Sequence, residues 1–217
     1  MKGEFIMDMT RKYIGRAVAL FLLALCAFMP ETAKAQINPR AYYQIGWQFD
    51  FPISSGFNDK MNDLGLYMEA GYYLTPHFSL GGFANINTRS NYVPRQTFTE
   101  GSSSVTTDQV RSFVQVPFGA SLRYRFAWRS RWQPYIGAKL GANYAEAEST
   151  QQVYAYSDKS WGVYASPEVG INFYPFKQKY VGFNLAAYYS YASNHGKVFY
   201  ANMDGMNNFG IRIGLAF

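Results

Sequence analysis

The sequence predicts an all-β protein, an eight-stranded antiparallel up-and-down barrel preceded by a cleaved signal peptide. Two observations predict the barrel. Apolar and polar residues alternate with a period of two in eight segments, a pattern typical of half-buried strands, and no segment follows the helical period. The connectors between the segments also alternate between short and long. The eight segments span residues 40–51, 63–74, 78–89, 109–126, 134–148, 159–174, 180–192 and 208–217.

The last of these segments shows the alternation most clearly. Glycine, alanine and Arg212 occupy one face. The opposite face is entirely apolar and consists of Phe209, Ile211, Ile213, Leu215 and Phe217. The other segments divide in the same way, so each predicted strand has one apolar face and one face of small or polar residues.

The connectors predict how the strands are joined. Three of them, at 75–77, 127–133 and 175–179, are short. The connectors that alternate with them are longer and rich in Ser, Asn, Gly and Asp, and they cover residues 52–62, 90–108, 149–158 and 193–207. Short turns at one rim and long loops at the other are typical of an up-and-down barrel, with both termini at the short-turn end.

Residues 1–35 are predicted to be a signal peptide, which leaves 36–217 as the barrel domain. A basic start leads into an apolar run at 17–29, and the small-residue sequence Ala-Lys-Ala at 33–35 provides a cleavage site. As a helix, this run rises roughly 20 Å, which is too short for a membrane core of about 30 Å. The only cysteine, Cys26, lies in the run, so we expect the processed chain to lack thiol chemistry.

The composition excludes several classes of protein. Aromatic residues make up 19% of the chain and charged residues only 16%, which is unlike a disordered or acidic interaction chain. The mean hydropathy of -0.21 argues against a bundle of membrane-spanning helices. The net charge of +6 is modest and the basic residues are scattered, so we expect no nucleic-acid partner.

Barrels of this size occur both in water and in membranes, with the apolar face on opposite sides. A soluble, lipocalin-like barrel would need many Lys and Glu on its outer face, whereas these strands carry few. Aromatic residues also gather near both ends of the segments, as they do at membrane interfaces. We therefore expect a transmembrane β-barrel. Its interface anchors are expected to include Trp128, Trp132 and Phe176 at the short-turn end, and Trp47 and Trp161 at the other end.

Two features carry a resemblance to a known family. Residues 114–119 (VQVPFG) lead into 122–126 (LRYRF), and the chain ends in Phe217, which closes an alternating strand. The chain resembles the small eight-stranded outer-membrane β-barrel family, which includes OmpX, the transmembrane half of OmpA and the PorT-like barrels. This resemblance implies the cell outer membrane of a Gram-negative bacterium, periplasmic termini and lipids of that membrane as partners. It also implies that Phe217 is an assembly signal for the barrel assembly machinery.

The interior of such a barrel is only wide enough to be filled by side chains. Five charged residues have inward parity at similar heights, and we expect them to meet in one ion-pair layer: Glu69, Arg123, Lys139, Glu168 and Arg212. The layer is either a conductance pathway or a sealed plug. The plug is favoured because charges removed from water must be paired. Hydrogen bonds to the layer are expected from Tyr67, Gln115, Asn143, Asn172 and Asn184.

Two prolines interrupt the predicted strands. Pro117 and Pro167 each remove a hydrogen-bond donor from the sheet. Because every strand of a closed barrel has two neighbours, we expect a local bulge at each proline. A bulge would reverse the inward parity beyond it, at 109–116 and 159–166.

The sequence contains little that predicts catalysis. His77 follows a proline in a short turn and is interpreted as structural. Ser193 and His195, with Asp204 in the same loop, would be the candidates for a lipid-modifying hydrolase, but their spacing is uninformative. No metal-ligand spacing or phosphate-binding glycine loop occurs, so we expect no enzyme, no metal and no cofactor.

Two surfaces of the predicted barrel suggest partners. Segments 109–126, 134–148 and 159–174 exceed the 9–11 residues that a spanning strand needs, so they should project on the long-loop side. An unpaired projecting edge can bind a surface protein by strand addition. At the other end, basic residues beside aromatic ones at 128–132 and 176–179 favour anionic headgroups over a protein partner.

Three functions therefore remain open. The first is a structural or surface-interaction (adhesin-like) barrel with a filled lumen, which resemblance to OmpX also implies. The second is a narrow pore or transporter. The third, implied by resemblance to the PorT-like barrels, is an accessory role in protein export.

Overall fold

The computed structural model describes residues 40–54, 61, 64–100, 103–151, 154–176, 181–198 and 201–217. All of them belong to one compact unit, Pro39–Phe217. The predicted signal peptide, its cleavage site and Cys26 lie outside the described residues. The described part of the chain includes no helix with the length and apolar character needed to cross a membrane.

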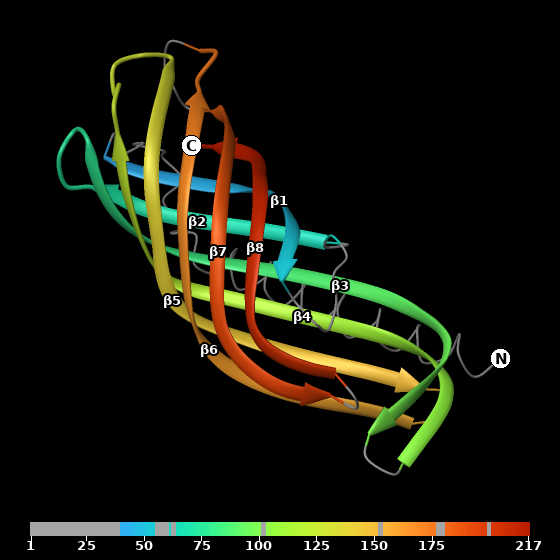
Figure 1. Ribbon diagram of the computed structural model, residues 1–217. Helices are drawn as coiled ribbons and strands as arrows, with labels where there is room; N and C mark the ends of the chain where they lie inside the picture. Colours follow the sequence, from blue (N-terminus) through green and yellow to red (C-terminus); the bar gives the residue numbers. More distant parts are fainter. Residues whose placement is uncertain are drawn as a thin grey trace, which may run out of the picture. The chain divides into compact units, whose positions relative to one another are not determined.

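The described residues form eight strands, each antiparallel to the next, and β1 pairs with β8 to close a barrel (Figure 1). This confirms the predicted all-β, eight-stranded architecture. The strands are β1 (Ala41–Ser54), β2 (Leu64–Tyr73), β3 (Phe78–Glu100), β4 (Ser103–Arg125), β5 (Trp132–Gln151), β6 (Tyr154–Phe173), β7 (Gly182–Val198) and β8 (Ala201–Ala216).

Several strands are longer than the alternation predicts. The region 90–108, expected to be a long loop, forms the outer parts of β3 and β4, which pair as far as Glu100↔Ser103. In Figure 1 this hairpin, drawn in green, extends past the ends of β1 and β2. Strand β8 begins at Ala201 instead of 208. The sequence did not reveal these extensions because polar residues interrupt any apolar face in them: Ser, Thr and Gln in the hairpin, and Asn, Asp and Gly at 201–207.

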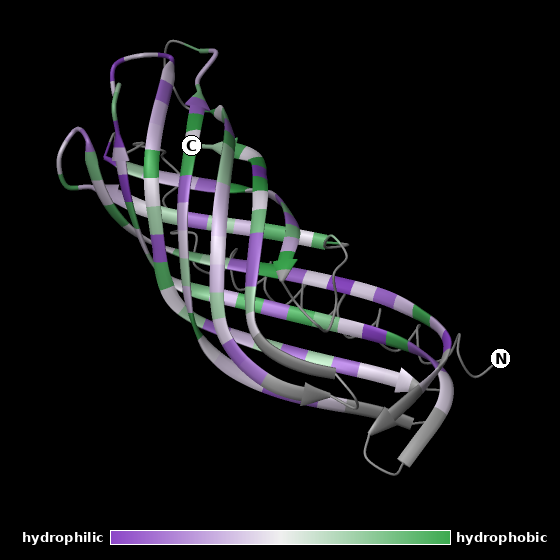
Figure 2. Cartoon of the chain, in the orientation of Figure 1, coloured by the Kyte–Doolittle hydropathy of each residue, from purple (hydrophilic) through white to green (hydrophobic). Residues whose placement is uncertain are grey.

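The apolar faces of the strands point outward and the polar faces point into the lumen. On β8, Ile213 is 50% exposed while Arg212 beside it is 1% exposed. Figure 2 shows the same alternation of hydrophobic and hydrophilic residues along β3 and β4. This arrangement is the reverse of a lipocalin-like barrel, which would have a polar exterior.

The expected bulges at Pro117 and Pro167 are absent, and that prediction was wrong. The β3–β4 register is the same above and below Pro117, and Pro167 remains paired with Ala138 of β5. A proline lacks only the N–H that faces one neighbouring strand, so the ladder on its other side persists. Inward parity is therefore kept along β4 and β6. The register shifts occur instead at Pro52/Ser54, Val93/Gln96 and Ala192/His195.

Inward-facing glycines allow neighbouring strands to approach closely. Gly119 of β4 lies directly opposite Gly141 of β5. A Cβ atom at Gly141 would lie 2.7 Å from the Cα atom of Gly119, a distance that real Cβ contacts do not reach. The same holds for two further cross-strand pairs, Gly46↔Gly214 and Gly71↔Gly81, where a Cβ atom on one glycine would come too close to the Cα atom of the other.

Gly141→Ala should destabilise the barrel by about 1–3 kcal/mol, because the new methyl group overpacks a site bounded by backbone. The matched control is Gly82→Ala, where the new Cβ would meet only one backbone oxygen, at 3.5 Å. Both substitutions restrict the unfolded chain equally. Urea unfolding in detergent, followed by tryptophan fluorescence, measures the difference. Equal stability of the two variants would contradict the close approach.

Candidate functional site

The structure brings the five predicted lumen charges together. They come from β2 (Glu69), β4 (Arg123), β5 (Lys139), β6 (Glu168) and β8 (Arg212), and each is at most 4% exposed. Glu69 accepts a hydrogen bond from Arg123 Nη2 and forms an ion pair with Lys139 Nζ, both at 2.8 Å. Glu168 forms an ion pair with Lys139 Nζ at 3.0 Å and accepts hydrogen bonds from Arg123 Nη2 at 3.4 Å and from Arg212 Nη1. We call these five residues the ionic layer.

A small residue provides the space that Glu168 occupies. Gly137 of β5 lies directly opposite Glu168 in the ladder, and a Cβ atom there would lie 3.0 Å from Glu168 Cγ. The carboxylate can therefore lie close to β5 and reach Lys139, two residues further along that strand.

The ionic layer contains three cations and two carboxylates, and aromatic rings lie beside all three cations, most closely beside the two arginines. The Arg123 guanidinium lies 4.0 Å from the Tyr135 ring centroid and 4.7 Å from that of Tyr42. The Arg212 guanidinium lies 3.8 Å from the Tyr188 centroid. Because the faces of aromatic rings carry partial negative charge, these contacts stabilise the positive charge that the carboxylates do not neutralise.

Three of the five predicted hydrogen-bonding residues form one chain beside the ionic layer. Tyr67 donates to Asn184 Oδ1 at 2.8 Å, and Asn184 Nδ2 donates to Asn172 Oδ1 at 2.7 Å. The other two are placed differently. Asn143 donates to Asn194 at 2.5 Å, and the Gln115 side-chain oxygen has no hydrogen-bond partner among the described residues.

A second buried ion pair was not predicted from the sequence. Arg89 Nη2 lies 3.6 Å from Asp50 Oδ2 and also donates to Asn208 at 2.9 Å. Gln48 Nε2 donates to Asp50 at 3.0 Å and Gln48 Oε1 accepts from Arg212, so the pair is linked to the ionic layer. Asp50 and Arg89 each lie near the end of a predicted segment. Counting along their strands would nevertheless have placed both side chains in the lumen.

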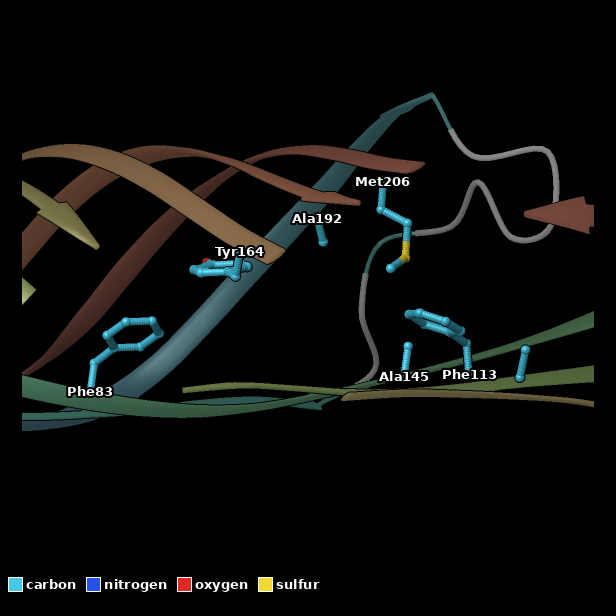
Figure 3. Packing of buried hydrophobic residues seen from close by; sticks show 7 residues of the cluster. Phe83, Phe113, Ala145, Tyr164, Ala192 and Met206 are labelled. Atoms are coloured by element: carbon cyan, nitrogen blue, oxygen red, sulfur yellow. The ribbon is translucent and has the colours of Figure 1, made fainter. Parts of the chain in front are cut away.

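Apolar side chains fill another part of the lumen. Figure 3 shows Met206 and Ala192 on one wall directed toward Phe113 and Ala145 on the other. The cluster draws residues from six strands, β3 to β8. Its members are Phe83, Phe113, Ala145, Ala147, Tyr164, Ala192 and Met206. The described lumen therefore combines paired charges with packed apolar groups.

The five predicted interface anchors all have exposed rings on the outer surface. Trp47 and Trp161 are 60% and 65% exposed. At the opposite end Trp128, Trp132 and Phe176 are 38%, 55% and 65% exposed. Their contact with lipid stays a prediction.

The residues weighed for catalysis have structural contacts. His77 Nδ1 lies 2.8 Å from the Arg125 carbonyl oxygen, and its ring stacks on Tyr124. Ser193 Oγ accepts the Val163 N–H at 2.9 Å, and His195 lies opposite Asp204 in the β7–β8 ladder. Within the described ranges, no three His, Cys, Asp or Glu side chains are grouped so that they could hold a metal ion.

Comparison with protein families agrees with this geometry. Residues 18–217 match the model of the outer membrane protein beta-barrel domain, so the chain belongs to that family. The predicted resemblance to small outer-membrane barrels is confirmed. Comparison with curated proteins finds no match.

Solved outer-membrane proteins share the fold. Neisserial surface protein A is 18% identical with a TM-score of 0.53, and the match covers 81% of this chain and 95% of that one. OprG from Pseudomonas aeruginosa is 18% identical with a TM-score of 0.50, covering 81% and 93%. The attachment invasion locus protein Ail of Yersinia pestis is 14% identical with a TM-score of 0.49, covering 82% and 98%.

Glu168→Ala should lower the free energy of unfolding by about 3–5 kcal/mol, because it leaves buried cations without their carboxylate. The control is Glu146→Ala, which removes a carboxylate 3.8 Å from the exposed Lys159 and should cost less than about 1 kcal/mol. Urea unfolding of both variants in the same detergent measures the difference. Similar stabilities would show that the ionic layer is not a stabilising network.

Proposed function

We propose that this protein is an outer-membrane barrel of a Gram-negative bacterium, with periplasmic termini, a closed lumen and a structural or adhesin-like role at the cell surface. It acts without catalysis. The observation that carries the proposal is the reversal of polarity described above, with apolar side chains outside and paired charges inside. Lipid is the solvent that stabilises such an exterior.

The outer surface supports a position in the bilayer. Large apolar side chains on all eight strands are exposed, including Leu140 at 56%, Val169 at 58% and Leu185 at 51%. Exposed tryptophans lie at both ends of this surface. A patch of this extent would promote aggregation in water, whereas acyl chains accommodate it.

The lumen supports a closed barrel. The ionic layer joins five strands, and an ion crossing it would have to displace ion pairs of 2.8–3.4 Å between side chains that are at most 4% exposed. The apolar cluster adds a further barrier, because polar solutes lose their hydration there.

The projecting strands support the surface role. Pairing between β2 and β3 ends at Leu64↔Thr88, so the outer part of β3 pairs with β4 alone among the described residues. Likewise, the ladder between β6 and β7 ends at Tyr164↔Ala192. These two edges differ. The shift at Val93/Gln96 and Pro94 interrupt β3. On β6 the side chains of Ser193 and Asn194 bind the Val163 N–H and the Ser160 carbonyl oxygen, and among the described residues only the part of β6 beyond Ser160 has no partner on this side. The β6 edge is therefore the better site for a surface protein that adds a strand.

The end of β8 supports assembly by the barrel assembly machinery. Phe217 exchanges backbone hydrogen bonds with Tyr43 of β1, at 2.8 and 3.1 Å, and its ring is 41% exposed. Phe217 thus lies at the seam that closes the barrel, where an assembly signal would be accessible before closure.

A narrow pore is the alternative that a specific observation favours. Several buried polar atoms, including Tyr164 OH and both side-chain polar atoms of Asn85, have no hydrogen-bond partner among the described residues. Buried polar atoms without protein partners are commonly satisfied by water, and connected waters would form a path.

For the export role, loss of secretion after deletion of the gene is the corresponding test.

Planar bilayer recording separates the closed barrel from the pore. Refolded protein should give no stepwise conductance in concentrated potassium chloride, because the ionic layer and the apolar cluster block the lumen. Incorporation is checked independently by the heat-dependent gel shift of folded barrels. Reproducible steps from the incorporated protein would favour the pore.

Cysteine labelling on intact cells tests the orientation. Thr106→Cys, on the exposed part of the projecting β4, should react with a membrane-impermeant maleimide. Ser130→Cys, in the short turn between β4 and β5, should react only after the membrane is disrupted. The reverse pattern would place the termini outside the cell and contradict the proposed orientation.

A further inference from the structure

The short-turn end of the barrel is basic. We call Arg40 and residues 74–77, 125–131 and 174–176 the short-turn rim. These residues include four arginines and no Asp or Glu. By contrast, the acidic side chains that the structure describes outside the lumen lie on the projecting side, at Asp108, Glu146, Glu148 and Asp158. The two ends of the barrel therefore differ in charge.

The turn between β4 and β5 is held in one conformation by buried polar contacts. Gln133, 3% exposed, donates from Nε2 to the carbonyl oxygens of Trp128 and Ser130, both at 3.2 Å. Ser130 Oγ in turn accepts the Trp132 N–H at 3.2 Å. Because these hydrogen bonds already order the turn, binding a ligand there costs less conformational entropy than binding to a flexible loop.

Neighbouring turns brace the same segment. The Arg131 carbonyl oxygen accepts the Tyr174 N–H at 2.9 Å, and the Arg125 N–H donates to the His77 carbonyl oxygen at 2.8 Å. Arg125 itself is occupied by contacts within the rim, because its Nε donates to the Pro76 carbonyl oxygen at 2.6 Å and its guanidinium lies over Tyr73. It is a structural cation.

Arg129 and Arg131 are the exposed cations of this turn. None of the described carboxylates forms an ion pair with either of them. The Arg129 guanidinium lies 4.6 Å from the Trp128 ring centroid, and Trp132 packs on Phe173 with ring centroids 4.2 Å apart. The Arg129 guanidinium thus lies against one exposed tryptophan, and Arg131 directly precedes the other in the chain.

We infer that this turn binds the phosphate of an anionic phospholipid, with Arg129 and Arg131 as the ligating side chains. The inference rests on the proposed position of the barrel in a membrane. Tryptophan rings reside at the level of the headgroups, so arginines held beside them lie at the level of the lipid phosphates. Guanidinium groups match phosphate oxygens in geometry as well as in charge.

A lipid fits this turn better than a protein partner. Trp128 and Trp132 flank the two cations in the chain. Trp132 packs on Phe173 of β6, and Phe126 packs on Tyr124 of β4, so aromatic rings extend from the turn toward the apolar outer surface. A ligand on this site must therefore offer an anionic group joined to an apolar chain. An anionic phospholipid such as phosphatidylglycerol has that combination.

Tryptophan quenching by brominated lipids tests the inference. The chain has four tryptophans, so Trp47→Phe with Trp161→Phe leaves Trp128 and Trp132 as reporters beside the turn. The protein is placed in phosphatidylcholine vesicles that contain phosphatidylglycerol, and either lipid is brominated at the same mole fraction. Brominated phosphatidylglycerol should quench the reporters more strongly. Arg129→Gln and Arg131→Gln should each reduce that preference by roughly fivefold, and added salt should weaken it.

The matched control is Lys159→Gln, an exposed cation on the projecting side, which should leave the preference unchanged. Equal quenching by the two lipids would overturn the inference and favour a protein as the ligand of this turn. A preference that survives both arginine substitutions would also overturn it, as would an equal loss in the control. Absence of quenching by either lipid would instead contradict the proposed membrane position, so the two failures are distinguishable.

Discussion

The buried charges of the lumen are the constraint on which the rest of this structure depends. Carboxylates and guanidinium groups removed from water are strongly destabilising unless each finds a partner. Here the partners come from β2, β4, β5, β6 and β8, so pairing is complete only when the sheet closes. Closure in turn directs the alternate residues outward, where they form an apolar surface. The same two-residue period thus produces both the buried charged layer and the apolar outer surface.

The two ends of the barrel differ in how they are built. At the short-turn rim, side chains such as Gln133 hold backbone carbonyl groups, and backbone hydrogen bonds connect successive turns. At the other end, β3 and β4 continue as a hairpin that pairs to Glu100↔Ser103 beyond the last partner of β2. One end is suited to hold a fixed position at an interface, and the other offers exposed sheet edges.

Much of the lumen was predictable because strand parity needs no tertiary information. Glu69 and Lys139 could be assigned to one layer by counting along their strands, and Gln48 or Asp50 would have been found in the same way. The effect of proline was not predictable by counting. At Pro117 the register is kept, because the residue pairs with Asn143 of β5 and this pairing does not require the missing N–H. In β3, by contrast, a register shift falls beside Pro94.

The sequence alone determined the number of strands, their order and the face on which each side chain lies, because a period of two is a local property of the backbone. The tertiary structure decided which inward groups meet. Arg89 finds Asp50, and Arg123 lies between Tyr42 and Tyr135, because the stagger of the closed barrel brings distant strands to one height. The projecting hairpin was likewise decided by pairing between strands, since its residues carry no apolar alternation of their own.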